Sequence, residues 1–283
     1  MTQTQQNTLW QVIKITCAAA IGGFLFGFDS AVINGTTLAL KASFNASDAS
    51  LGAAVSVALL SAAAGAYFAG RLADKFGRVR CMLLASFLFL ISAIGSGMPF
   101  GIPDFIFWRA VGGAAIGIAS IIAPIYIAET APAHLRGRLG SMQQFAIVIG
   151  IFAALLSNWL VVRLAMSLDV NTSLYMIPEA TLQKNGGFAN AEILWGTKAW
   201  QWMFWLEAIP ALLYGIFALR LPESPRYLVS QGRLSEAQEV LTKISPEHMD
   251  DEMEAISETF KNTTPAKLSD LFETLANGTR RVA

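Results

Sequence analysis

Cysteine, histidine and charged residues are all scarce in this chain. Its 283 residues include two cysteines and two histidines, and only 14% are charged, against roughly 25% in soluble domains. Cys17 and Cys81 both lie inside apolar runs, so they indicate neither a disulfide framework nor a metal site. Twenty basic residues balance twenty acidic ones, and no net field attracts nucleic acid. No nucleophile, metal set or phosphate loop is evident, so we expect neither an enzyme nor a cofactor.

Apolar sequence, by contrast, is abundant: 54% of the residues are hydrophobic and the mean hydropathy is +0.50. Because a helix needs ~20 mainly apolar residues to cross a bilayer, six segments qualify as membrane spans. They cover residues 10–40, 51–70, 80–98, 102–128, 139–162 and 200–221. The sequence predicts an all-α polytopic membrane protein with six transmembrane helices, the first of them retained rather than cleaved as a leader.

Lysine and arginine gather in alternate short connections between these segments. Residues 71–80 hold four of them, Arg136 and Arg138 lie in the fourth connection, and the third connection has none. Basic loops face the cytoplasm, so we expect both chain ends there, in a plasma membrane or bacterial inner membrane. The long connection 163–199 would then be an outer loop.

The chain changes character after Pro222. Glu and Lys recur at helical spacing in the polar segments 235–244, 246–260 and 266–275, a pattern typical of amphipathic helices. We therefore expect a membrane domain over residues 1–222 and a cytoplasmic helical domain over 223–283.

Three ionisable side chains, Asp29, Arg109 and Glu207, lie well inside apolar segments. A charge at the centre of a membrane helix costs ~2.5–3.5 kcal/mol or more, so such residues are by default functional or paired. At ~1.5 Å per residue, all three lie ~8–10 Å below the outer ends of their helices. One cation and two carboxylates could thus meet in one layer, either as a proton relay or as a static ion network. Glu207 is the weaker member, because it could face an outer vestibule.

Acidic residues and arginines recur together where three predicted helices leave the membrane on the cytoplasmic face. This mixture predicts a lattice of salt bridges between helices, which could open and close as a gate. Two of these cytoplasmic helix ends are three helices apart along the chain, which favours a 3+3 repeat. The residues are Arg71, Asp74, Arg78, Glu129, Arg136, Arg138, Glu223 and Arg226.

Small residues recur in the second and fourth predicted helices. Gly113 and Gly117 form a GxxxG pattern, and Gly65 and Gly70 follow in the second helix. Such patterns allow helix backbones to approach closely, so we expect tight packing at these positions.

Five segments together resemble the N-terminal half of a sugar porter of the major facilitator superfamily, over most of residues 20–230. They are GGFLFGFDSAVING (22–35), GRLADKFGRVR (70–80), RAVGGAAIGIAS (109–120), PIYIAETAPAHLRGRLGSMQQF (124–145) and PESPRYL (222–228). The resemblance implies that Asp29 is a proton-coupling carboxylate, with Arg109 as its partner and Glu207 close by.

The resemblance also implies a sugar site. Phe26 would pack against the sugar, and Gln144 would bind a sugar hydroxyl. Seven residues after this glutamine, related xylose and glucose porters often carry a second glutamine, whereas this chain has Ile151. An unpaired hydroxyl costs ~1–3 kcal/mol, so the identity of the sugar stays open.

The function implied is transport of a monosaccharide by alternating access, as a sugar:proton symporter. A facilitative carrier with a static ion pair is the first alternative. The second is a truncated half-transporter or sensor that transports nothing alone, because sugar porters have twelve spans. The expected partners are a monosaccharide, a proton, the lipid bilayer, and a second half on further chain or on a partner protein.

Overall fold

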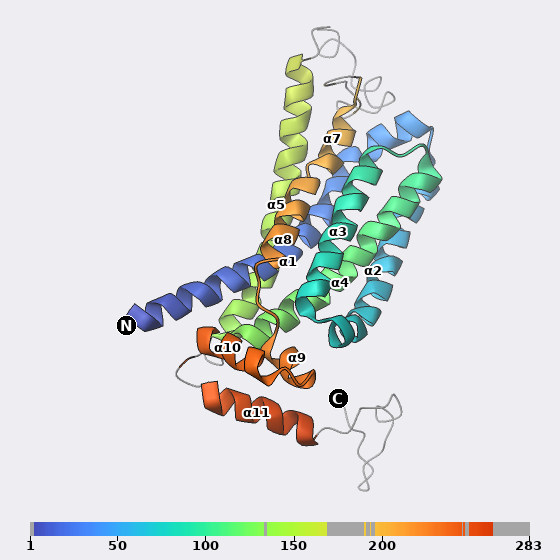
Figure 1. Ribbon diagram of the computed structural model, residues 1–283. Coiled ribbons are helices and arrows are strands. Elements are labelled where there is room, and N and C mark those ends of the chain that lie inside the picture. Colours follow the sequence, from blue (N-terminus) through green and yellow to red (C-terminus); the bar gives the residue numbers. More distant parts are fainter. Residues whose placement is uncertain are drawn as a thin grey trace, which may run out of the picture.

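The computed structural model describes residues 3–132, 135–168, 190, 193, 196–244, 246 and 249–262. Their long helices are packed side by side, and shorter helices lie across one end (Figure 1). The helices are α1 (Gln3–Phe44), α2 (Asp48–Phe76), α3 (Arg78–Gly97), α4 (Ile102–Thr130), α5 (Arg136–Leu168), α7 (Ala199–Trp205), α8 (Ala208–Ala218), α9 (Pro225–Ser230), α10 (Leu234–Ile244) and α11 (Met249–Asn262).

Within the described residues, five helices, α1 to α5, are long and apolar enough to cross a membrane. All five were predicted, and the structure extends most of them by several residues at their ends. The sixth predicted span, 200–221, differs because it is divided into α7 and α8 by a turn at Leu206 and Glu207. Pro210 has no N–H, and its ring clashes with the carbonyl four residues earlier, at Leu206. This proline accounts for the break.

Glycines set the closest contacts between helices. A Cβ at Gly27 of α1 would collide with the Ile147 carbonyl of α5, and one at Gly150 of α5 would collide with α1. In the same way, Gly117 of α4 faces the Ala62 carbonyl of α2, and Gly65 of α2 faces α4. The predicted close packing of α2 and α4 is thus confirmed, except at Gly70, where nothing lies within 4 Å of a Cβ.

This pairing has the exchanged order that two related three-helix units would give. The second helix of each unit, α2 or α5, packs along the first helix of the other, α4 or α1. The two first helices, α1 and α4, also contact each other at the centre. Accordingly, α1 and α4 are mostly buried, whereas α2 and α5 are mostly exposed.

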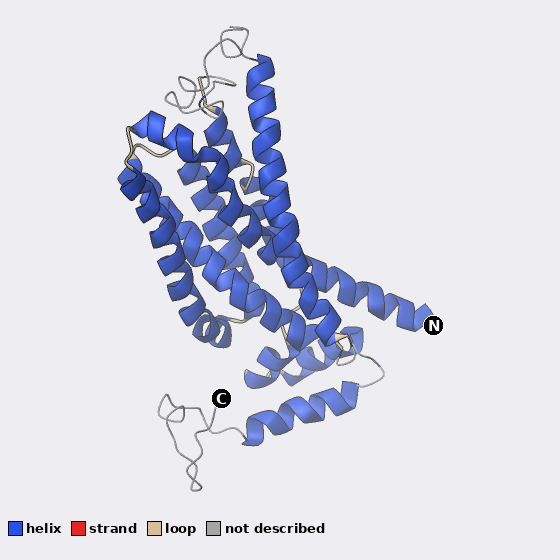
Figure 2. Cartoon of the chain, turned by 180° about the vertical axis from the view of Figure 1, so that it is seen from behind, coloured by secondary structure: helices blue, strands red, loops and turns tan. Residues whose placement is uncertain are grey.

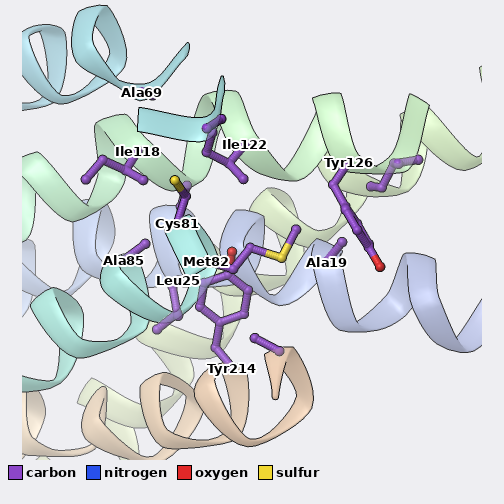
Figure 3. Close-up of a cluster of buried hydrophobic side chains, with 14 of the residues drawn as sticks. Ala19, Leu25, Ala69, Cys81, Met82, Ala85, Ile118, Ile122, Tyr126 and Tyr214 are labelled. Atoms are coloured by element: carbon purple, nitrogen blue, oxygen red, sulfur yellow. The ribbon is translucent and has the colours of Figure 1, made fainter. Parts of the chain in front are cut away.

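Two apolar clusters fill the bundle. Figure 3 shows the larger one, in which Leu25 of α1, Met82 of α3 and Tyr214 of α8 point toward one another. The second cluster lies farther along the helices and includes Phe105 of α4 and Phe204 of α7. The division between the clusters falls on the charged residues described below.

The short helices α9, α10 and α11 lie at one end of the bundle, called here the α10 end. The N-terminal part of α1 projects at the same end, as both views show (Figures 1 and 2). The predicted polar helices 235–244 and 246–260 correspond to α10 and α11, and the third, 266–275, lies outside the described residues. Ser224 caps α9, because its hydroxyl accepts the N–H of Tyr227 and Pro225 occupies the first turn.

Candidate functional site

A buried ion pair joins α1 and α4 at the centre of the bundle. Arg109 Nη1 donates to Asp29 Oδ1 at 2.5 Å, and Nη2 donates to Oδ2 at 2.8 Å. Asp29 is fully buried and Arg109 is 3% exposed. Two parallel charge-assisted bonds are the strongest geometry available to such a pair, and they offset part of its desolvation. The sequence prediction that these two residues lie in one layer is confirmed.

The local sequence explains why the two helices can meet here. Asp29 lies between Leu25, in one apolar cluster, and Val32, in the other. Arg109 likewise lies between Phe105 of one cluster and Ala115 of the other. The charges therefore occupy a polar layer with apolar packing above and below it, which excludes water from both sides.

Glu207 belongs to the same layer. It is 1% exposed and interacts electrostatically with both Asp29 and Arg109. Among the described residues, its Oε1 atom and Arg109 Nε have no hydrogen-bond partner. The concern that Glu207 faces an outer vestibule is therefore wrong, since the break between α7 and α8 holds this side chain inside the bundle.

The predicted sugar-binding residues are more exposed than the ion layer. Phe26 is half-buried against the larger apolar cluster, Gln144 is exposed, and Ile151 is 39% exposed. The neighbouring Gln143, which sequence reasoning missed, is 7% exposed and packs against Gly23. Within the described part of the chain, neither atom of its amide group has a partner. The glycine pair at 22–23 could have indicated this buried position, because glycine leaves room beside α1 for a side chain of a neighbouring helix.

A second charged cluster lies at the α10 end, where α3, α4 and the start of α9 meet. Arg78 is 8% exposed, and its Nε and Nη2 atoms each donate to Glu129 at 2.9 Å. Ser224 also donates to Glu129, at 2.5 Å. Three of the predicted residues, Arg78, Glu129 and Glu223, meet here, whereas Ser224 was not predicted. Its place directly before a proline was the signal for a capping residue.

Glu223 contributes by capping α3 rather than by pairing with an arginine side chain. Its carboxylate accepts the backbone N–H groups of Arg78, at 2.9 Å, and Val79, at 3.3 Å. A carboxylate at a helix N-terminus satisfies unpaired donors and interacts favourably with the helix dipole. Gly77, whose φ of +94° favours glycine, brings the turn against this carboxylate. The acid thus holds the turn between α2 and α3.

The other predicted lattice residues are peripheral. Asp74 is exposed and lies 3.4 Å from Arg78, and Arg71 stacks on the Tyr67 ring instead of meeting an acid. Arg136 and Arg138 are exposed at the start of α5. The predicted lattice is therefore smaller than the sequence suggested, because charges one turn from the helix contacts reach solvent instead.

These features define a class of protein. Several apolar helices joined by glycine contacts, with a water-excluded ion layer at their centre, are the features of a polytopic membrane protein. In such proteins, intramembrane charges mark substrate or ion pathways.

Comparisons with known proteins narrow this class. The family described as "Sugar (and other) transporter" matches residues 15–283, so the chain belongs to this family, whose members are transporters and not enzymes. It is 50% identical, over 260 residues, to the glucose transport protein of Synechocystis sp., covering 92% of this chain and 51% of that protein. It is 34% identical to the D-xylose-proton symporter of Escherichia coli, over 85% of this chain and 49% of the relative.

Solved structures agree with this assignment. The proton:xylose symporter XylE bound to 6-bromo-6-deoxy-D-glucose, a major facilitator superfamily protein, has a TM-score of 0.72 at 31% identity. The match covers 88% of this chain and 53% of that protein. The chain thus spans about half the length of the curated relatives it matches.

Proposed function

We propose that this chain provides the N-terminal half of a sugar:proton symporter that works by alternating access. The observation that carries the proposal is the buried, bidentate Asp29–Arg109 pair with Glu207 beside it, in a chain of the sugar transporter family. Relatives named as D-xylose-proton and arabinose-proton symporters support the coupling to protons.

The ion layer suggests how a proton would act. When Asp29 is ionised, it holds both terminal nitrogens of Arg109. Protonation would remove the charge and one of the two acceptors, and the arginine would then be drawn to Glu207, whose Oε1 is otherwise unpaired among the described residues. Because Asp29 belongs to α1 and Glu207 to the break between α7 and α8, this exchange of partners would change how α1 and α4 are held together.

Sugar would bind on the face of the bundle that includes Gln144 and Phe26. Gln144 is exposed in α5, so its amide is free to pair with a hydroxyl of the sugar. Ile151 offers an apolar contact two turns farther along, where a hydroxyl would gain no partner. We propose that a monosaccharide occupies this face. The residues on the opposite side of the sugar would then decide between hexoses and pentoses.

That wall would belong to a second half, on further chain or on a partner protein. The large exposed apolar side chains of α5, such as Phe152 and Leu156, and of α2, such as Leu59 and Leu60, suit lipid or a second helical bundle. Since the relatives are about twice as long, a second bundle is the simpler occupant of part of this surface. The α10 end, which carries the Arg78 cluster and the projecting N-terminal part of α1, would face the cytoplasm of a plasma membrane or bacterial inner membrane, with residues 223–283 as a cytoplasmic helical domain.

The Arg78–Glu129–Glu223 cluster would then be a cytoplasmic gate. It ties the α2–α3 turn to the end of α4 and to the residues after α8. Opening the transporter toward the cytoplasm would require these bonds to break, and the exposed Arg71, Asp74, Arg136, Arg138 and Arg226 would lie at the rim of the gate.

Asp29→Asn tests the coupling role. The protein used is the complete transporter, this chain together with its second half, reconstituted in liposomes. The amide keeps the size of the side chain but cannot cycle between charged and neutral forms. We expect accumulation of sugar driven by a pH gradient to be lost, whereas exchange of sugar at equal concentrations persists. Asp104→Asn is the matched control, because Asp104 lies in the first turn of α4, away from the ion layer, and accepts the exposed N–H of Phe100 in the preceding turn.

Three outcomes separate the alternatives. Loss of accumulation with retained exchange, in Asp29→Asn only, supports symport. Unchanged pH-driven accumulation in this variant refutes the role of Asp29. If the unaltered protein equilibrates sugar without any response to pH, the chain belongs to a facilitative carrier and the ion pair is static.

A further inference from the structure

A cavity of about 840 Å³ lies at the α10 end, between α1, the end of α8 and α10. Its apolar wall includes Ile21 and Phe217. Three cationic side chains, Lys14, Arg220 and Lys243, also line it, and no acidic residue among those the structure describes does. A cavity that is apolar on one side and cationic on the other is suited to a ligand with an apolar body and an anionic head.

Among the described residues, a carboxylate pairs with one of the three cations of this cavity and leaves the other two unpaired. Lys243 donates to Glu239 of its own helix at 2.7 Å, and that bond lowers the pKa of the glutamate carboxyl below its ordinary value. Lys14 and Arg220 are exposed, and neither makes an ion pair with any residue that the structure describes. The lysine of α1 and the arginine after α8 therefore carry the net positive charge.

The depth of these two cations matches the lipid headgroups. Lys14 lies about 15 residues from Asp29, and Arg220 lies about 13 residues from Glu207, which is ~20 Å along each helix. The half-thickness of the hydrocarbon core is ~15 Å. With the ion layer near the bilayer midplane, where transporter sites lie, Arg220 reaches the headgroup region, and Lys14, on the inclined start of α1, lines the same cavity near that level (Figure 1). Ile21 is at the depth of the acyl chains, and Phe217 is at their edge.

We infer that this cavity binds an acidic phospholipid, with the phosphate between Lys14 and Arg220 and an acyl chain against Ile21 and Phe217. Basic cavities between helix ends on the cytoplasmic side are suited to such headgroups. A soluble anion would leave the apolar wall in water, and a zwitterionic lipid would bring no net charge to the two cations. The inference depends on the chain crossing a membrane, and not on proton coupling.

Cys17 provides a site-specific probe, since it lines the cavity and is exposed, whereas Cys81 is buried. The chain is purified in detergent, stripped of lipid, and labelled with uncharged N-ethylmaleimide at increasing concentrations of phosphatidylglycerol. We expect the lipid to cover the thiol and slow its labelling, and phosphatidylcholine to do so much less.

Lys14→Gln/Arg220→Gln is the test variant. A basic residue near an acidic lipid surface contributes about fivefold to affinity, so we expect the half-protecting concentration of phosphatidylglycerol to rise ~25-fold. Lys75→Gln/Arg80→Gln, two equivalent changes at the same end of the bundle but outside the cavity, should leave it unchanged. The labelling rate of each variant without lipid shows that Cys17 keeps its exposure.

Three results would overturn the inference. Equal protection by phosphatidylcholine would show an apolar cavity without headgroup selectivity. Equal protection by soluble glycerol 1-phosphate would show an anion site that needs no lipid. An equal shift in both double variants would show a diffuse surface charge and no defined site.

Discussion

Replacing Gly117 by alanine tests the helix contacts on which the whole bundle depends. Its missing Cβ faces the backbone carbonyl of Ala62 across the α2–α4 contact, with the N–H of Ala66 also close. A clash with the end of a flexible side chain is relieved by a rotation, whereas a clash with backbone is relieved only if the helices separate. The same substitution at Gly70 of α2 meets nothing within 4 Å.

The expected free energies have opposite signs. In an open helical position, alanine is favoured over glycine by roughly 0.5–1 kcal/mol, so Gly70→Ala should raise the free energy of unfolding by that amount. At Gly117 the same gain is opposed by overpacking, which costs about 1–3 kcal/mol, and the rigid carbonyl makes the upper part of this range appropriate. Gly117→Ala should therefore lower the free energy of unfolding by about 1–2 kcal/mol.

The assay is unfolding of the detergent-solubilised chain by sodium dodecyl sulfate, followed by tryptophan fluorescence. Because both variants make the same chemical change, the difference between them, about 2–3 kcal/mol, isolates the helix contact. A Gly117→Ala protein at least as stable as the unaltered chain would refute the close α2–α4 approach. Equal effects in both variants would show that only helix propensity is being measured.

Two further predictions concern the α10 end, and the same assay checks both. Glu129→Gln leaves the nearly buried Arg78 guanidinium with the exposed Asp74 as its charged partner. Because the amide also keeps one acceptor, we expect a loss of about 2–3 kcal/mol, below that of a fully unpaired buried charge. Glu239→Gln, at an exposed pair, is the control and should change nothing measurable. Tyr126→Phe removes the hydroxyl that donates to the Pro222 carbonyl at 2.6 Å. We expect the free energy of unfolding to fall by about 1 kcal/mol. A fall as large as that of Glu129→Gln would contradict the expectation that a neutral hydrogen bond contributes less than a buried ion pair.

The sequence was sufficient to predict the features that depend on length and depth. Helices α1 to α5 follow from runs of apolar residues, and the Asp29–Arg109 pair follows from counting residues along two such runs. In a membrane protein both quantities are fixed by the thickness of the bilayer, so errors of a few residues at helix ends do little harm. A pairing of charges at similar depth therefore survives imprecise boundaries.

Features that depend on helix rotation could not be predicted in this way. Successive residues on a helix point about 100° apart, which is enough to bury Gln143 and expose Gln144. The break in the sixth segment was missed for a different reason: the apolar run continues through Pro210, and the proline itself was the signal for a break. Arg71 was placed in the salt-bridge lattice because spacing along the chain does not show which side of a helix end faces its neighbour.

The placement of the ion pair within the glycine contacts connects the fold to the proposed coupling. Gly27 and Gly150 hold α1 against α5, and Gly65 and Gly117 hold α4 against α2, through contacts that cannot change by small amounts because backbone meets backbone. The two pairs of helices meet where α1 contacts α4, and the bond between Asp29 and Arg109 spans this contact. A proton that neutralises the aspartate would therefore act at the junction of two rigid units, where the loss of one bidentate bond changes their relative position instead of being absorbed within either unit.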